Sequence, residues 1–377
     1  MPTNPSVILL FEDDFTIVKD FEKKLKPKLG KALELVVFPL DQPSLHDHAP
    51  YDARVEEWVR SSGFYDRLVL IVTDHDLSAN SDCWRGLSQS AVSGAAKQLG
   101  IPVAGYRRAK VKPEVELKRI PGDGLIDLDP DLVRRAEQVA TLAKGFIELE
   151  KRVTNNHAPE TGNSSRKRSA QMHISSPGAL LAKVLDHPST AGHFDTFACG
   201  DQVAIGEILS FSHETGKLPT HVRRRLIAAL GVWLSDLVMR YPGVLVNKVA
   251  AASYLDIHTE DFSQTSVQRL FARARYKDLP FEDKAEPLWW RHVLDEILAE
   301  AECSSGLQLT EKKGIEGIRY CPCSVDSTLH AGYYCMASHD PISGEKSSGR
   351  VRWFPPGADL ARLKASTYRR LAPWIGT

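Results

Sequence analysis

The sequence lacks an excess of charge of either sign, and it has no long apolar run. Lys and Arg together number 48, as do Asp and Glu, so the 377-residue chain has no global basic field of the kind that attracts nucleic acid. No apolar run approaches the length that spans a bilayer. The opening residues MPTNPSVILLFEDD have no basic segment before the short run VILLF, so we expect neither a signal peptide nor a membrane contact.

Cysteine is scarce, and the common catalytic motifs are missing. Six cysteines in a chain of this length, with no secretory signal, indicate a reducing compartment rather than a disulfide framework, so we expect a cytoplasmic protein. The sequence contains no P-loop, no GxSxG and no HExxH. After residue 153 we find no convincing catalytic constellation, so the sequence does not indicate an enzyme.

The first 150 residues alternate strand-like and helix-like segments. Apolar runs predict five strands: Val7–Phe11, Leu33–Phe38, Leu68–Val72, Ile101–Tyr106 and Gly124–Leu128. Helical spacing and capping residues predict helices at 15–29, 53–60 and 87–99, and a long one over Asp131–Val153. This alternation is typical of an α/β fold with a doubly wound, parallel five-stranded sheet of the receiver or flavodoxin type, here over residues 1–153.

The rest of the chain changes character twice. Residues 154–176 are polar and lack periodicity, which predicts a linker. Residues 177–302 read as a mainly helical domain, with helices expected over His221–Arg240, Leu245–Tyr254 and Leu288–Glu302. Residues 303–377 hold four of the six cysteines with several glycines and aromatics, which indicates a small α+β module.

Acidic residues follow two of the predicted strands. The first strand runs into Glu12-Asp13-Asp14 and the third into Asp74-His75-Asp76. Ligands of open parallel sheets bind beyond the carboxyl ends of the strands, so carboxylates on two neighbouring strands would converge there. Such a group is best satisfied by a hard divalent cation, typically Mg²⁺. The alternative is that these acids only cap turns and helices.

Here the sequence resembles response-regulator receiver domains of two-component signalling, over about residues 5–153. The segment ILLFEDD is similar to the family's first strand with its acidic pair, and VTDHDLS to its third strand. The resemblance implies that Asp74 accepts a phosphoryl group and that Glu12, Asp13 and Asp74 bind Mg²⁺. It also implies a histidine-kinase-like or other ATPase partner, in a divergent receiver of the kind found in bacterial conflict or defence signalling.

Two positions depart from the receiver pattern. Receivers carry Ser or Thr at the end of strand four and Lys at the end of strand five. This sequence has Tyr106 and Arg107 at the first place and Asp129 at the second, and neither Lys110 nor Lys112 lies at a strand end. Asp129 would repel a phosphorylated Asp74, so we expect phospho-Asp74 to be short-lived or absent.

Four residues near the end of the chain have the residue types of a zinc site. Cys321, Cys323, Cys335 and His339 give the spacing C-x-C-x₁₁-C-x₃-H, with His330 as an alternative ligand. Thiolates and imidazoles suit tetrahedral Zn²⁺. The alternative is a set of reduced, buried thiols.

A basic segment leaves a third function class open. Arg223, Arg224 and Arg225 begin a predicted helix and would suit DNA phosphates, although internal contacts also account for them.

We therefore expect a signalling protein whose receiver-like domain regulates a C-terminal output region. The alternatives are a non-phosphorylated pseudo-receiver scaffold that docks a histidine-kinase-like ATPase, and a DNA-binding transcriptional regulator. A homodimer formed through the long helix Asp131–Val153 also stays open.

Overall fold

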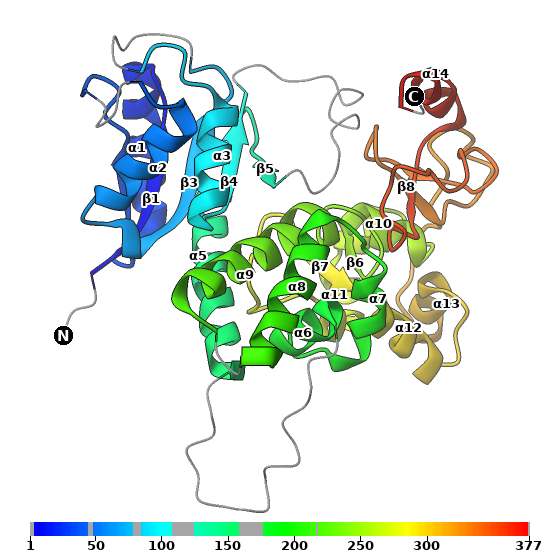
Figure 1. The fold of residues 1–377 in the computed structure, drawn as a ribbon. Helices are drawn as coiled ribbons and strands as arrows, with labels where there is room; N and C mark the ends of the chain where they lie inside the picture. Colours follow the sequence, from blue (N-terminus) through cyan, green and yellow to red (C-terminus); the bar gives the residue numbers. More distant parts are fainter. Residues whose placement is uncertain are drawn as a thin grey trace, which may run out of the picture. The chain divides into compact units, whose positions relative to one another are not determined.

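The chain forms two compact units in a computed structural model (Figure 1). The structure describes residues 4–43, 48–77, 84–107, 124–157, 176–215 and 218–375. The sheet unit consists of the described residues within 1–110, 122–188 and 200–233. The C-terminal unit consists of those within 189–199 and 234–377.

The sheet unit contains an all-parallel five-stranded sheet with the strand order β2-β1-β3-β4-β5 (Figure 1, blue to cyan). The strands are β1 (Ser6–Phe11), β2 (Leu33–Val37), β3 (Leu68–Asp74), β4 (Val103–Tyr106) and β5 (Leu125–Asp127). This confirms the predicted α/β fold and its parallel five-stranded sheet. The order also makes β1 and β3 direct neighbours, as the converging-carboxylate prediction required.

The apolar runs form strands because the sheet buries both of its faces. Val7, Leu9 and Phe11 point to one face, where they join a core cluster with Val55 of α2 (Tyr51–Ser61) and Val92 of α3 (Gln89–Leu99). Side chains alternate along a strand, so the intervening residues of β1 face the opposite side. The helix α1 (Phe15–Leu29) packs against α5 (Leu132–His157), and α5 also contacts β3.

Side-chain caps determine where these helices begin. Asp14 accepts hydrogen bonds from the backbone N–H groups of Thr16 and Ile17 at 2.9 and 3.3 Å, which starts α1 directly after β1. Asp131 accepts from the N–H groups of Val133 and Arg134 at 3.1 and 2.9 Å at the start of α5. Acidic caps are favoured because the first N–H groups of a helix have no intrahelical partner.

Three further helices belong to the sheet unit: α6 (Pro177–Val184), α8 (Gly200–Thr215) and α9 (Thr220–Val232). At Gly231 of α9, an added Cβ would lie 2.2 Å from the Phe146 ring of α5, so this glycine permits the close approach of the two helices. The compact units therefore divide the predicted helical domain of residues 177–302 between them. Of the predicted linker, residues 158–175 lie outside the described residues.

The C-terminal unit begins two of its helices later than predicted. Where helices were expected from Leu245 and Leu288, the chain first forms the antiparallel strands β6 (Leu245–Asn247) and β7 (Leu288–Trp290). Each strand then leads directly into a helix, α10 (Lys248–Tyr254) or α12 (Arg291–Glu300). The prediction was wrong there because a short, wholly buried apolar run fits a strand or a helix equally well, and only tertiary pairing decides.

The remaining elements of this unit are short. A three-stranded sheet has the order β10-β8-β9, with β8 (Tyr333–Cys335), β9 (Pro341–Ile342) and β10 (Ala361–Arg362). Four helices complete the unit: α7 (Ala191–Asp195), α11 (Thr265–Leu270), α13 (Gly306–Lys312) and α14 (Ala365–Ile375). None of the helices in the described part of the chain is both long and apolar enough to cross a lipid bilayer.

Candidate metal and phosphoryl-acceptor site

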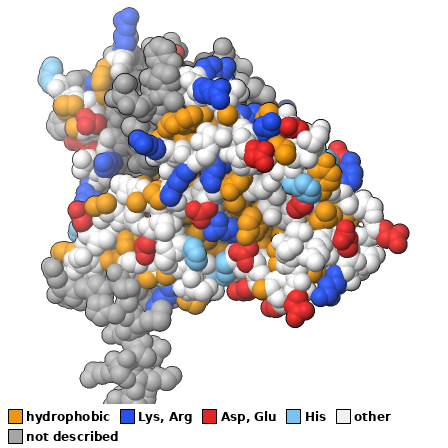
Figure 2. All heavy atoms as spheres, turned by 90° about the vertical axis from the view of Figure 1, so that its right-hand side faces the viewer, with side chains coloured by type: hydrophobic (Ala, Val, Ile, Leu, Met, Phe, Trp, Pro, Cys, Tyr) orange, Lys and Arg blue, Asp and Glu red, His pale blue; other side chains and the backbone are white. Residues whose placement is uncertain are grey.

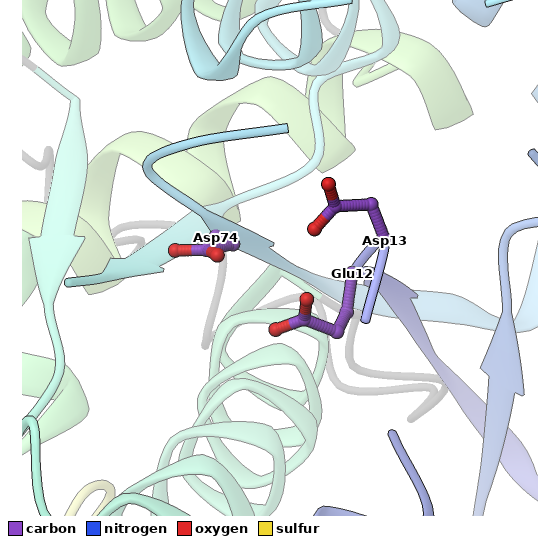
Figure 3. Close-up of side chains that lie close together, drawn as sticks. All are labelled: Glu12, Asp13 and Asp74. Atoms are coloured by element: carbon purple, nitrogen blue, oxygen red, sulfur yellow. The ribbon is translucent and has the colours of Figure 1, made fainter. Parts of the chain in front are cut away.

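Three carboxylates meet at the carboxyl edge of the parallel sheet (Figure 3). β1 and β3 pair in parallel with Phe11 opposite Thr73, so Glu12 and Asp74 follow at adjacent strand ends. One carboxylate oxygen from each of Glu12, Asp13 and Asp74 lies within 4.8 Å of the others. Among the described residues, they form the only group of three or more histidine, cysteine or acidic side chains arranged closely enough to hold an ion. The structure thus brings together the three residues predicted to bind Mg²⁺.

The three acids that follow β1 have different roles. Asp14 caps α1, and its carboxylate is not part of the cluster. Glu12 is buried with only 3% of its surface exposed, whereas Asp13 is half-buried. The Oε1 atom of Glu12 accepts a hydrogen bond from the N–H of Asp14 at 2.9 Å. The cluster therefore has a fixed, buried member and a more accessible one on the same strand end.

Asp74 is the most deeply buried acid of the cluster, with 1% of its surface exposed. Its Oδ1 atom accepts the backbone N–H of His75 at 2.7 Å. His75 itself is turned to Gln89, whose Oε1 lies 3.0 Å from Nδ1 of the ring. A buried carboxylate is costly unless hydrogen bonds or a cation compensate it, so the surroundings of Asp74 decide what it can do.

Tyr106 ends β4 and lies directly opposite Asp74 in the sheet register. Its hydroxyl donates a short hydrogen bond to Oε2 of Glu12. Burial, together with the negative charge of Glu12, raises the pKa of Tyr106 far above its usual range, so the phenol remains a donor. The sequence places Tyr106 where receivers carry a hydroxyl residue, and the structure directs its hydroxyl to Glu12 instead of leaving it free for Asp74.

Arg135 is a site residue that the sequence analysis missed. It lies in the first turn of α5, is 4% exposed, and its guanidinium carbon is 3.7 Å from the centre of the Tyr106 ring. Its Nε and Nη2 atoms donate to the carbonyl oxygens of Asp129 and Pro130 at 3.1 and 2.7 Å. Burial lowers its pKa, while the nearby charges of Asp74 and Glu12 act in the opposite direction. An arginine stays protonated under these conditions, so it is a fixed cation beside the acid cluster.

A signal for Arg135 was present in the sequence. The segment DPDLVRRAEQ has two arginines in the first turn of a predicted helix, where the helix dipole disfavours positive charge. Such a placement indicates an anionic partner. The acid cluster at the sheet edge provides one.

Asp129, expected to repel a phosphorylated Asp74, is committed to the turn before α5. Its Oδ1 atom accepts the N–H of Asp131 at 2.7 Å, and its own N–H donates to Oε1 of Gln138 at 2.7 Å. It does not belong to the acid cluster. Lys110 and Lys112 lie outside the described residues.

The structure does not bring Cys321, Cys323, Cys335 and His339 together as a metal-binding group. Cys323 and Cys335 share a small hydrophobic cluster with Ile342, and Cys321 is also buried. Burial raises the pKa of Cys321 to about 12; for Cys323, burial acts in the same direction, but hydrogen bonds with Ser343 and Val325 outweigh it and lower the pKa. Nδ1 of His339 lies 2.5 Å from the hydroxyl of Tyr334. This geometry matches the alternative of buried thiols, and the zinc site stays a prediction.

The arginines at the start of α9 make contacts inside the sheet unit. Arg224 donates to the carbonyl oxygen of Tyr65 at 3.0 Å and stacks over its ring at 4.5 Å. Arg225 donates to the carbonyl oxygen of Gln98 at 3.4 Å. These contacts favour a structural role of Arg224 and Arg225 over DNA binding. Figure 2 shows basic and acidic side chains intermixed on the face that it draws.

Neither a comparison with protein-family models nor a search of curated proteins finds a match to this chain.

Proposed function

We propose that the sheet unit is a receiver-like regulatory domain that binds Mg²⁺ at Glu12, Asp13 and Asp74 and presents Asp74 to a phosphoryl donor. The observation that carries this proposal is the convergence of the three carboxylates at the ends of β1 and β3. The strand order β2-β1-β3-β4-β5 supports it, because doubly wound sheets of this order bind their ligands at the β1/β3 edge.

The residues present fit a hard divalent cation. Three carboxylates from two strand ends offer oxygen ligands, and the half-buried Asp13 leaves the cluster open to solvent. When bound, Mg²⁺ would offset the negative charges of the carboxylates and of the oxygens of an incoming phosphoryl group. One carboxylate oxygen of Asp74 attacks phosphorus, and the bond from phosphorus to the donor's leaving atom breaks, so that this atom departs with the bonding electrons. The product is an acyl phosphate on Asp74.

The surroundings of Asp74 also support a second candidate, a pseudo-receiver that is never phosphorylated. Glu12 is already held by the Tyr106 hydroxyl, and Arg135 places a permanent cation next to the cluster. This arrangement compensates the acids without a metal ion. In that case the domain would act as a scaffold or adaptor that docks a histidine-kinase-like ATPase.

Phosphorylation separates the two candidates. The full chain is incubated with acetyl phosphate, with and without Mg²⁺, and the mass of the peptide that contains Asp74 is followed. A Mg²⁺-dependent adduct that Asp74→Asn removes supports the receiver-like domain. If no adduct forms at any time point, rapidly quenched samples included, while Asp74→Asn still impairs binding of a histidine-kinase-like ATPase, the result supports the scaffold. Under both candidates the C-terminal unit is the output region, and the partner is an ATPase of the histidine-kinase kind.

A further inference from the structure

A histidine–aspartate pair lies on the surface of the C-terminal unit. The proposed function gives this pair no chemical role. Nδ1 of His330 is 2.8 Å from Oδ2 of Asp256. The imidazole stacks on the ring of Tyr320, with 4.5 Å between the centroids and 26° between the planes. The side chain of His330 is nevertheless 61% exposed. Two neighbours thus hold the ring in place while much of it stays open to solvent.

The position of Asp256 is itself well determined. Asp256 follows Leu255, the residue that caps the end of α10. Its backbone φ is 56°, in the left-handed region that Asp adopts more readily than most residues. Its second carboxylate oxygen accepts the backbone N–H of Cys321 at 3.2 Å. The carboxylate is therefore anchored on one side and directed to the imidazole on the other.

This contact fixes the tautomer of the ring. An ionised carboxylate only accepts hydrogen bonds, so Nδ1 of His330 carries the hydrogen in the neutral imidazole. The lone pair then lies on Nε2. The carboxylate also stabilises positive charge that develops on the ring when Nε2 reacts, as in other aspartate–histidine pairs.

The pair does not serve to activate the neighbouring thiol. Cys321 is fully buried, and its backbone N–H, not its sulfur, contacts Asp256. Nε2 of His330, the ring nitrogen that does not face Asp256, is accordingly the reactive atom of the arrangement. With so much of the ring exposed, the reactant comes from solution or from another protein domain.

We propose that His330 is a phosphoryl acceptor that is modified on Nε2, with an acyl phosphate or a phosphoramidate as the class of donor. The Nε2 lone pair attacks phosphorus, and the bond from phosphorus to the donor's oxygen or nitrogen breaks. The carboxylate or amine leaves with the bonding electrons. Nδ1 keeps its hydrogen, and the resulting ring cation is paired with Asp256. This step does not depend on Asp74.

The competing explanation is structural. The backbone of His330 pairs with that of Pro322 in an isolated bridge, so the aspartate contact would also tie this segment to the end of α10. A purely structural histidine would give no covalent adduct. Detection of the adduct therefore distinguishes the two roles.

The test uses the full chain carrying Asp74→Asn, so that the acid cluster cannot supply the adduct. This protein is incubated with phosphoramidate and analysed at alkaline pH, where phosphohistidine survives and acyl phosphates hydrolyse. We expect a single phosphohistidine at residue 330. It should be absent in His330→Gln and present in His339→Gln. His339 is a suitable control because its Nδ1 faces the Tyr334 hydroxyl instead of a carboxylate. Asp256→Asn should slow its formation by about tenfold or more.

The outcomes separate this inference from the proposed function. An adduct at residue 330 in the Asp74→Asn chain supports the inference, whatever happens at Asp74 in the unmodified chain. An adduct on Asp74 in the unmodified chain, with none at residue 330 in either chain, supports the receiver-like domain and overturns the role of His330. Unchanged labelling in His330→Gln, or no phosphohistidine in a chain whose circular dichroism spectrum is native, also overturns it.

Discussion

The guanidinium of Arg135 lies 3.7 Å from the centre of the Tyr106 ring, and the hydroxyl of that ring donates a hydrogen bond to Glu12. One aromatic ring thus connects the first turn of α5 to the acid cluster at the sheet edge. Cation–π contacts of this kind are strongest when desolvated, and Arg135 is almost fully buried. In this arrangement Glu12 accepts hydrogen bonds from the Asp14 N–H and from the Tyr106 hydroxyl.

Tyr106→Phe should strengthen Mg²⁺ binding. In the intact protein, the phenol of Tyr106 competes with a cation for the negative charge of the Glu12 carboxylate. A hydrogen bond to a carboxylate is worth roughly 1.5–3 kcal/mol, so we expect an affinity gain of about tenfold by calorimetric titration. Without Mg²⁺ the variant should lose about 1–3 kcal/mol of unfolding free energy, because a buried acceptor loses its donor. Tyr65→Phe is the control; unchanged or weaker Mg²⁺ binding in Tyr106→Phe would contradict this account.

Substitution by Asn should lower Mg²⁺ affinity at Asp13 but not at the adjacent Asp14. Asp13→Asn replaces a charged carboxylate ligand with a neutral amide oxygen, so Mg²⁺ affinity should fall on the order of tenfold with little loss of stability. Asp14→Asn keeps an amide oxygen that can cap α1, and should leave both properties nearly unchanged. Asp14→Ala removes the cap and should lower the unfolding free energy by about 1 kcal/mol without affecting Mg²⁺ binding. Equal loss of binding in Asp13→Asn and Asp14→Ala would mean that the cluster is not a cation site.

Much of the sheet unit could be predicted because its signals are local. The central strands β1, β3 and β4 are buried on both faces, so they appear in the sequence as apolar runs, and the acids at the ends of β1 and β3 indicated a shared edge. Which acid caps a helix and which faces the cluster was not predictable, because both roles use the same residue type. Only the observed contacts separate Asp14 from Asp13.

What the sequence could not provide were contacts between distant residues. Arg135 and Tyr106 are close because β4 and the start of α5 meet at the sheet edge. A local sequence pattern does not predict a contact between residues so far apart in the chain. The same limit applies to the pairing of Val246 with Trp289, which turns two predicted helix starts into strands. The sequence indicates His330 only as a zinc ligand, because its contact with Asp256 joins residues that lie 74 positions apart.

The ion pair between Asp261 and Arg319 should make the stability of the C-terminal unit depend on pH. Nε of Arg319 donates to Oδ2 of Asp261 at 2.9 Å, and this hydrogen bond is the largest cause that lowers the pKa of Asp261 to about 2 from 3.8. A lowered native pKa stabilises the fold above the unfolded-state value, and that contribution is lost as pH falls through the native value. Arg319→Met should therefore unfold at lower urea than the intact chain from pH 7 to about 5, and the difference should close between about pH 4 and 2.

Arg273→Met is the matched control for this pH dependence. It removes an arginine from an exposed pair with Glu300, in which both side chains are more than half exposed. Such pairs contribute little, so this variant should follow the intact chain at every pH. A pH-independent loss in Arg319→Met would show that the arginine acts through packing and not through the charge of Asp261.

The last prediction concerns the lifetime of phospho-Asp74, and it rests on the receiver-like proposal. In a receiver, a hydroxyl and a lysine stabilise the phosphoryl group. In this protein the Tyr106 hydroxyl is engaged with Glu12, and Arg135 is held by the carbonyl oxygens of Asp129 and Pro130. Neither donor is free to follow a phosphoryl group, so we expect an adduct on Asp74 to be short-lived or below detection at steady state. Rapid-quench mass spectrometry after mixing with acetyl phosphate and Mg²⁺ measures its decay.

Three variants probe the cause of this short lifetime. Asp74→Asn should abolish the adduct, and Asp76→Asn, which changes an exposed acid two residues later, should leave its decay unchanged. Tyr106→Thr shortens the side chain at the end of β4 and frees its hydroxyl from Glu12, so it should lengthen the lifetime of the adduct several-fold. A stable, stoichiometric adduct in the unmodified chain that changes its oligomeric state would overturn this view, because the switch would then work with Tyr106 and Arg135 in place.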